Sequence, residues 1–224
     1  PMRAIWMGDD SKFYVVRQSR DIQRADLCVV DVASATAKDL IVEEMNTSIE
    51  WQMPTLVSND TEIVQWSERT GWAHLYRYDA EGNLLNAITK GEWHVSNVLG
   101  ADDAKRVIYF TATGYNKDEN PYYLHLFRVN YDGSGLKQLD PMGFNGEFSL
   151  SDDKRYFTTT YSRVDAAPVS ELYTTEGKRV MALESVDLEP LFAMGYTYPE
   201  RFVVKAADGI TDIHGVMYNP KNSN

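Results

Sequence analysis

The feature of this sequence that most constrains its fold is an internal repeat. A short apolar run that opens with a polar residue and a leucine, and that ends in a turn, occurs four times. Its leucines are spaced by 48, 51 and 46 residues, at Leu27, Leu75, Leu126 and Leu172. Repetition at this period predicts copies of one supersecondary unit stacked against each other.

Asp-rich turns form a second marker with nearly the same period. Intervals of 50, 43 and 50 residues separate Asp10, Asp60, Asp103 and Asp153. An apolar run follows each turn, and we expect it to be the opening strand of its unit. These runs are Phe13–Val16, Ile63–Trp66, Val107–Phe110 and Tyr156–Tyr161. About four short strands per unit, repeating every 43 to 51 residues, are typical of a β-propeller blade, whose period is about 40–50 residues.

Glycines mark the hairpin turns of these units. Tight turns need a positive φ, which we expect at Gly82, Gly133, Gly177 and Gly209. The leucine runs span Asp26–Asp31, His74–Asp79, His125–Asn130 and Glu171–Thr175, and further short strands follow at Asp39–Glu43, Leu84–Thr89, Leu136–Leu139 and Arg179–Leu183. Longer loops are expected at Gly114–Pro121 and Arg163–Pro168, each with a proline just ahead of a strand.

The pattern changes near Pro199. Before it, a short helix is expected over Leu188–Met194, capped by Asp187 and ended by Gly195. After it, a lone hairpin of Arg201–Ala206 and Ile210–Tyr218 does not continue the repeat. The sequence therefore predicts an all-β fold. Residues 1–199 form a partial β-propeller of about four consecutive four-stranded antiparallel blades with one short helix near the C-terminus, and residues 200–224 form a linker and hairpin.

Composition limits the partners of the chain. The net charge of −11 is unfavourable for nucleic acid and for anionic membrane surfaces. No apolar run approaches the roughly 18 residues of a membrane span. The single cysteine, Cys28, lies in an apolar run, so we expect a buried structural thiol and no disulfide. The chain begins at a proline within a strand-like run, which suggests a segment of a longer protein.

The sequence contains no complete catalytic motif. Acyl transfer needs a nucleophile on a sharp turn and a base, and no Gly-x-Ser-x-Gly occurs. His74 and His125 occupy equivalent repeat positions, so a structural role is favoured for both. His94 and His214 lie in apolar strands without a serine motif nearby.

Binding motifs are equally sparse. The paired aspartates lack EF-hand spacing, and we expect them to bond their own turns. Glu43 and Glu44 could bind a substrate amine, although a solvated strand edge is favoured. A third group, Trp66, Trp72 and Trp93, could stack on a ligand, although packing between blades is favoured. We therefore expect no catalytic, cofactor-binding or metal-binding residue in this chain, and no cofactor.

Several stretches resemble the β-propeller of the dipeptidyl peptidase IV family of serine peptidases, in its bacterial form. The most specific are WSERTGWAHLYRYD (Trp66–Asp79) and FVVKAADGITDIHGVMYNP (Phe202–Pro220). Further support comes from Phe13–Asp31, Thr89–Val95, Tyr109–Gly114, Pro121–Val129 and Tyr156–Pro168. The second specific stretch resembles the entry into the α/β-hydrolase domain of that family.

The resemblance implies a peptidase that removes N-terminal dipeptides with Pro or Ala at the second position. It implies a catalytic triad in a hydrolase domain beyond Asn224, and substrate-binding glutamates before Pro1, so Glu43 and Glu44 are not assigned that role. On this interpretation the chain is a non-catalytic wall that gates peptide substrates and positions the hydrolase domain. Residence in the periplasm or at the cell surface of a bacterium is implied as well.

Two alternatives remain at this stage. One is a stand-alone propeller scaffold for protein–protein interaction, and the other is a different member of the prolyl oligopeptidase group. A partial propeller also leaves one uncovered apolar face on each end blade, which favours pairing between copies, such as a homodimer.

Overall fold

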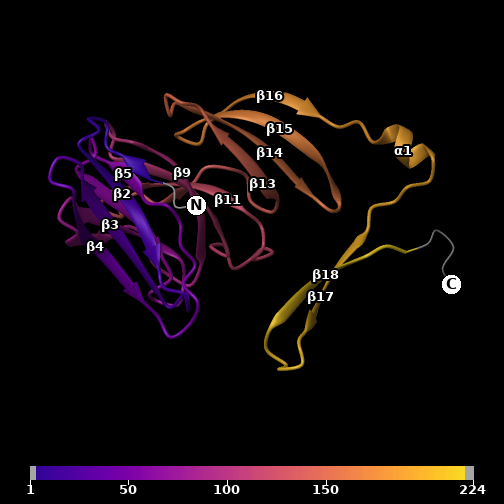
Figure 1. Cartoon of the computed structure of the whole chain (residues 1–224). Coiled ribbons are helices and arrows are strands. Elements are labelled where there is room, and N and C mark those ends of the chain that lie inside the picture. The colour runs from indigo at the N-terminus through magenta and orange to yellow at the C-terminus, as the bar shows by residue number, and fades with distance from the viewer. Residues whose placement is uncertain (1–3, 220–224) are drawn as a thin grey trace. The chain divides into compact units, whose positions relative to one another are not determined.

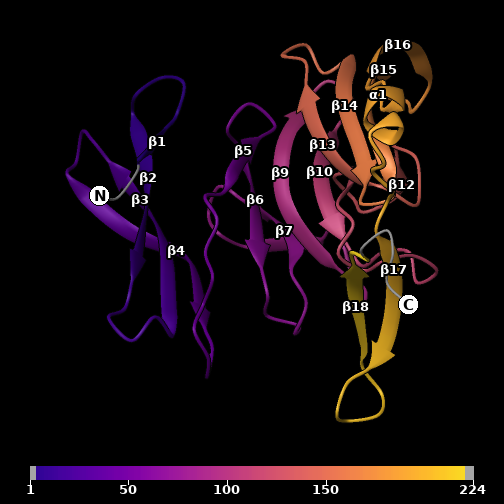
Figure 2. The ribbon, with the colours of Figure 1, turned by 90° about the vertical axis from the view of Figure 1, so that its right-hand side faces the viewer.

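The structure is a computed structural model that describes residues 4–219. Within this range the chain forms four four-stranded antiparallel sheets, one two-stranded sheet and one short helix (Figure 1). Each four-stranded sheet takes its strands in order from one continuous stretch of chain, as Figure 2 shows for β1 to β4 in indigo. The predicted all-β fold with four blade-like units is confirmed.

The strands have the following bounds. The first sheet holds β1 (Ile5–Trp6), β2 (Lys12–Gln18), β3 (Arg24–Asp31) and β4 (Thr36–Glu44). The second holds β5 (Thr55–Val57), β6 (Glu62–Ser67), β7 (His74–Asp79) and β8 (Leu84–Ala87). The third holds β9 (His94–Asp102), β10 (Val107–Thr113), β11 (His125–Asn130) and β12 (Lys137–Gln138). The fourth holds β13 (Asn145–Leu150), β14 (Tyr156–Arg163), β15 (Ala166–Thr174) and β16 (Arg179–Ser185).

The Asp-rich turns lie inside the sheets rather than ahead of them. Each turn joins the first strand of a sheet to the second, so the strands expected to open the units are β2, β6, β10 and β14. The prediction was therefore wrong by one strand. In the first two sheets the missed strands, β1 and β5, have only two and three residues, too few to show an alternation of side chains.

The chain divides into two compact units. Among the described residues, one comprises 4–115 with 127–137, and the other comprises 116–126 with 138–219. The first unit has two apolar clusters. Around Tyr14, Leu27, Ile63 and Tyr78, one cluster joins the first and second sheets. Around Trp66, Trp93, Phe110 and Phe127, the other joins the second and third sheets.

Burial differs between the middle sheets and the fourth. Strand β6 is buried at every residue from Ile63 to Ser67, so both faces of its sheet are covered. In β14, Phe157 and Thr159 are buried while Tyr156 and Thr158 are exposed. The repeat leucines follow the same trend, because Leu27, Leu75 and Leu126 are fully buried and Leu172 is only half-buried. One face of the fourth sheet is therefore open, as expected for an end blade.

Two hairpin glycines fit against the neighbouring sheet as well as supplying a positive φ. At Gly82, φ is 88°, and an added Cβ would lie 2.4 Å from the carbonyl oxygen of Leu40 in β4. At Gly133, φ is 87°, and an added Cβ would lie 2.9 Å from the carbonyl oxygen of Ile88, just after β8. The turn of one sheet thus touches the outer strand of the preceding sheet, which leaves no room for a side chain.

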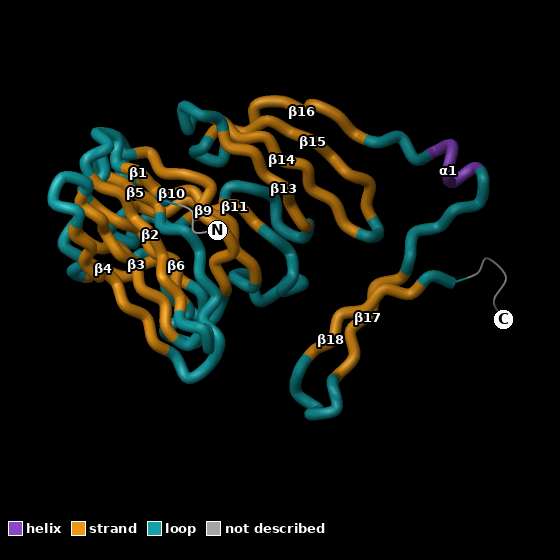
Figure 3. The backbone as a smooth tube through the Cα atoms, in the orientation of Figure 1, coloured by secondary structure: helices purple, strands orange, loops and turns teal. Residues whose placement is uncertain are grey.

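The C-terminal elements largely match the sequence. Helix α1 (Glu189–Ala193) is the one helix among the described residues (Figure 3) and is shorter than expected at both ends. Its N-cap is Leu188, while Asp187 accepts a hydrogen bond from the N–H of Glu189 at 2.9 Å. At the other end, Gly195 has a φ of 96°, as a C-terminal glycine requires.

The lone hairpin forms a two-stranded sheet of β17 (Glu200–Lys205) and β18 (Asp212–Met217). In the fourth sheet the long loop expected at 163–168 is wrong. Only Val164 and Asp165 join β14 to β15, and Pro168 lies inside β15, next to an irregularity in the pairing. A missing N–H is tolerated at such a position.

Candidate functional site

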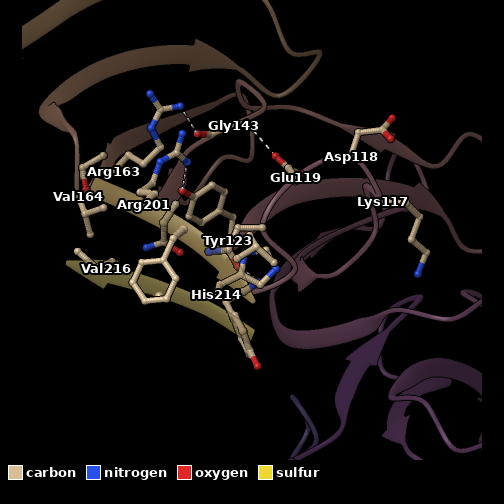
Figure 4. A pocket seen from close by; sticks show the side chains of 17 residues that line it. Lys117, Asp118, Glu119, Tyr123, Gly143, Arg163, Val164, Arg201, His214 and Val216 are labelled. Carbon is tan, nitrogen blue, oxygen red and sulfur yellow. Dashed lines mark hydrogen bonds between the residues drawn. The ribbon is translucent and has the colours of Figure 1, made fainter. Parts of the chain in front are cut away.

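A pocket of about 870 Å³ is the candidate site of the second unit. Figure 4 shows that its wall combines the 117–123 loop, the segment around Gly143, the turn after β14, and the β17–β18 hairpin. Its lining mixes aromatic side chains with charged ones, as ligand-binding and interface pockets commonly do.

Two arginines on one side of the pocket share a single carboxylate. In the turn after β14, Asp165 accepts a hydrogen bond of 2.5 Å from Nε of Arg163, and its other oxygen lies 3.0 Å from Nε of Arg201 in β17. Arg201 also donates through Nη1 to the hydroxyl of Tyr123 at 3.2 Å. Two separate segments of the second unit therefore meet at one carboxylate, and Arg201 connects them to a third segment through Tyr123.

Partial burial alone would raise the pKa of Asp165. The hydrogen bond and charge of Arg163 and the charge of Arg201 outweigh it, so the pKa of this carboxyl lies below its usual value. Asp165 is therefore ionised at neutral pH, as an anchor for two guanidinium groups must be.

The loop on the opposite wall is held by a partly buried glutamate. Glu119 accepts hydrogen bonds from the backbone N–H of Gly143 at 2.7 Å and from the side-chain amide of Asn116 at 2.6 Å. The carbonyl of Gly143 in turn accepts from Nη1 of Arg163 at 3.2 Å. Figure 4 shows this path from Glu119 through Gly143 to Arg163.

Behind Glu119 lies His125 of β11. Its Nδ1 lies 2.7 Å from Oδ2 of Asp140, and its Nε2 lies 3.0 Å from Oε1 of Glu119, within ion-pair range but off the direction of a hydrogen bond. Burial lowers the pKa of His125, but the hydrogen bond and charge of Asp140, with the charge of Glu119, outweigh it and raise the pKa above its usual value. The imidazolium is thus stabilised between two carboxylates.

The equivalent histidine of the second sheet has neutral partners. His74 contacts the hydroxyl of Thr89 at 3.1 Å and the carbonyl of Gly91 at 2.9 Å, and burial lowers its pKa. In both sheets the partner lies fifteen residues after the histidine and also accepts from the N–H of the following leucine. Both histidines are buried and paired within their own sheets, as a structural role requires, and the partner is the hydroxyl of Thr89 in one sheet and the carboxylate of Asp140 in the other.

The remaining histidines make aromatic contacts. The ring of His94 packs edge-on against Trp66 with 5.9 Å between centroids. His214 lines the pocket and meets Tyr122 edge-on at 6.3 Å. These contacts are not the hydrogen bond from a hydroxyl to an imidazole that an activated nucleophile needs.

The structure shows the surroundings of the cysteine and of the three tryptophans that the sequence analysis considered. Cys28 is buried, and burial raises the pKa of its thiol to about 11, as expected for a structural cysteine. Trp66 and Trp93 belong to the core between the second and third sheets, which confirms their packing role. The same prediction is wrong for Trp72, which is 43% exposed.

The adjacent glutamates have different environments. Glu44 is exposed and pairs with Arg24, as the expected solvated edge would. The prediction is wrong for Glu43, which is buried and forms a close ion pair with Arg69. The guanidinium of Arg69 also lies over the ring of Tyr76, 4.3 Å from its centroid. Sequence patterns miss this pair because 26 residues separate its partners.

The Asp-rich turns also divide into two kinds. Asp153 bonds the N–H of Arg155 in its own turn, as predicted. Asp60 instead accepts from the N–H of Gly8, and Asp103 accepts from the N–H groups of Ser58 and Asn59, both in the preceding sheet. The prediction of purely local bonding is wrong for these two, which connect successive sheets.

Residues 4–219 contain no group of three His, Cys, Asp or Glu side chains placed to hold a metal ion. The described part of the chain also has no helix that is both long and apolar enough to cross a membrane.

In the first unit the successive four-stranded sheets pack face to face, and carboxylates at their turns join one sheet to the next. This arrangement defines the chain as a β-propeller segment. It belongs to the family described as the dipeptidyl peptidase IV (DPP IV) N-terminal region, whose model matches residues 2–168.

Similar proteins agree with this assignment. A probable dipeptidyl peptidase 4 of Aspergillus flavus is 27% identical over 164 residues, covering 67% of this chain and 20% of the relative. The dipeptidyl peptidase 4 of Trichophyton equinum is 34% identical over 118 residues, covering 52% of this chain and 15% of the relative. This chain therefore spans about a fifth or less of the length of these relatives.

Solved structures share the fold. The crystal structure of Porphyromonas gingivalis dipeptidyl peptidase 4 matches with a TM-score of 0.80 at 19% identity, covering 96% of this chain and 30% of that one. The crystal structure of a putative dipeptidyl aminopeptidase IV from Bacteroides ovatus matches with a TM-score of 0.73 at 24% identity, covering 96% and 33%.

Proposed function

We propose that this chain is the propeller portion of a serine exopeptidase that releases N-terminal X-Pro and X-Ala dipeptides. In it the propeller restricts access of peptide substrates and positions a hydrolase domain that carries the catalytic triad. Membership of the DPP IV N-terminal region family and the dipeptidyl peptidase 4 relatives support this proposal.

The observation that carries the proposal is the β17–β18 hairpin. Cross-strand pairing places Phe202 with Gly215 and Val204 with Ile213, so Phe202, Val204 and Ile213 share one face. That face is 39–49% exposed at these three residues. A two-stranded sheet is marginal on its own, and an apolar face needs a further layer. A hairpin of this kind fits the first two strands of a following domain.

The test compares this chain with the protein translated from the complete reading frame. We expect the longer protein to cleave a Gly-Pro p-nitroanilide and a serine-directed organophosphate to abolish the cleavage, while this chain alone is inactive. Cleavage by this chain alone would overturn the proposal. An inactive longer protein that folds and binds protein partners would also overturn it, and would favour the scaffold alternative.

Two further parts of the proposal concern the location of the protein and the pairing of its copies. We place the protein in the periplasm or at the surface of a bacterium, on the family resemblance alone, and fractionation of the producing cells tests this. We also propose that copies of the chain pair through the open face of the fourth sheet, where Met181 is 50% exposed beside half-buried Leu172. Light scattering that gives a monomer at high concentration would contradict the pairing.

A further inference from the structure

We infer that Asp165 is a positioning residue, which holds the β17–β18 hairpin on the fourth sheet through Arg201 and thereby orients the domain to which the hairpin belongs. The catalytic part of this inference rests on the proposed function, while the anchoring part concerns this chain alone.

The hairpin has few other means of attachment. Every residue of β17 is exposed, and so are four of the six residues of β18. Between described residues, three directed contacts join it to the rest of the second unit: the pair from Arg201 to Asp165, the hydrogen bond from Arg201 to Tyr123 and the ring contact of His214 with Tyr122. Two of these three contacts pass through one guanidinium.

The turn of the fourth sheet that binds Arg201 is held firmly in place. Asp165 lies in a two-residue turn between β14 and β15, so its backbone is held by strand pairing on both sides. Arg163 fixes one oxygen of the carboxylate, and its own guanidinium bonds Gly143 and lies 4.9 Å from the ring centroid of Phe144. The second oxygen of Asp165 therefore faces Arg201 in a set direction.

The same carboxylate connects the hairpin to the pocket loop. Contacts run from Arg201 to Asp165, then to Arg163 and Gly143, and end at the partly buried Glu119 beside His125. A continuous set of directed bonds of this kind can transmit orientation, whereas an apolar contact permits sliding. Removal of the charge on Asp165 also leaves two guanidinium groups facing each other.

The first experiment uses this chain. Hydrogen exchange of residues 200–217 is measured in the wild type, Asp165→Asn and Asp212→Asn. The control removes the same charge from an ion pair inside the hairpin, where Lys205 lies 2.5 Å from Asp212. We expect Asp165→Asn to speed exchange in the hairpin about three- to tenfold with β14 and β15 unchanged, and Asp212→Asn to leave the attachment intact. Equal exchange in the two variants would overturn the inference.

A double-mutant cycle then tests the route through Arg201. If Asp165 acts through this arginine, adding Asp165→Asn to Arg201→Gln produces no further effect, because Arg201→Gln already removes the contacts to Asp165 and Tyr123. Additive effects would contradict the route. Arg201→Gln alone provides the test if Asp165→Asn fails to fold, because Arg201 is half-exposed on the hairpin.

The second experiment uses the longer protein and a Gly-Pro p-nitroanilide. We expect Asp165→Asn to lower kcat about three- to tenfold, with KM changed less and the melting temperature nearly unchanged, because a small misplacement of catalytic groups slows chemistry. Activity equal to that of Asp212→Asn would overturn the positioning role. A wild-type protein without any activity contradicts the proposed function instead, and the exchange experiment still decides the anchor.

Discussion

The indole N–H of Trp66 in β6 donates a hydrogen bond to the carbonyl of Val95 in β9 at 2.7 Å. This bond joins the second sheet to the third inside the apolar cluster that both sheets share. A buried carbonyl at this position is satisfied by a side chain from a neighbouring sheet, so the bond specifies which residues of the two sheets face each other.

Replacement of Trp66 therefore tests the contact between sheets. We expect Trp66→Phe to lower the free energy of unfolding by about 1–3 kcal/mol, because the Val95 carbonyl stays buried without its donor and a void remains. Denaturant unfolding measures the change. Trp72→Phe is the matched control, since Trp72 is largely exposed, and it should change stability by less than about 0.5 kcal/mol. Equal effects would contradict this account.

Gly82 and Gly71 allow two requirements for glycine to be tested separately, namely a positive φ and a close approach of another backbone. Both have a φ of 88°, but nothing lies within 4 Å of an added Cβ at Gly71, whereas Leu40 blocks one at Gly82. We expect Gly71→Ala to cost about 1–2 kcal/mol for the left-handed backbone, and Gly82→Ala to cost about 1–3 kcal/mol more because two backbones must move apart. Similar unfolding free energies for the two variants would show that the close approach does not matter.

Asp103 should make stability depend on acid pH. Its burial raises its pKa, but hydrogen bonds from the N–H groups of Asn59 and Ser58 and from Tyr131 outweigh this and hold the pKa below the usual value of an aspartate. A lowered carboxyl pKa stabilises the fold above the unfolded value, and the contribution is lost as pH falls below about 4.

Asp103→Asn should cost about 1–3 kcal/mol at neutral pH and flatten the loss of stability below pH 4. The free energy of unfolding measured between pH 2 and 7 checks both effects. Asp152→Asn serves as control because Asp152 is exposed in the equivalent turn of the fourth sheet. An acid profile that Asp103→Asn leaves unchanged would rule out this contribution.

His74 and His125 should respond to pH in opposite directions. The raised pKa of His125 gives stability that is complete below the unfolded pKa of about 6.5 and is lost as pH rises through the folded value. The lowered pKa of His74 gives stability that is present above about 6.5 and is lost as pH falls towards the folded value.

NMR titration of the imidazole signals tests this directly, with His74→Gln and His125→Gln for assignment. The signal of His125 should titrate above pH 6.5 and that of His74 below it. The carboxylates facing His125 are Asp140 and Glu119, so Asp140→Asn should bring its pKa down. Two histidines that titrate together would contradict the assigned role of Asp140.

The repeat made most of the fold predictable. The leucines and glycines recur at the blade period, and β7 and β11 have the bounds expected from their runs. Prediction failed where the local pattern is too short, as in β1 and β5, or where the partner is distant in sequence, as for Glu43 with Arg69 and Asp103 with Ser58. The pocket could not be predicted for the same reason, since Asp165 and Arg201 meet only in three dimensions.

By itself the sequence determined the class of fold, the period of the repeat and the family. Periodic apolar residues and turn glycines act locally, so they can be read along the chain. Only the tertiary structure decided which face of each sheet is covered, whether His125 lies beside a carboxylate or a hydroxyl, and what attaches the hairpin. Burial and charge pairing depend on residues that folding brings together from separate parts of the chain. The spacing of residues along the sequence does not show which of them become neighbours.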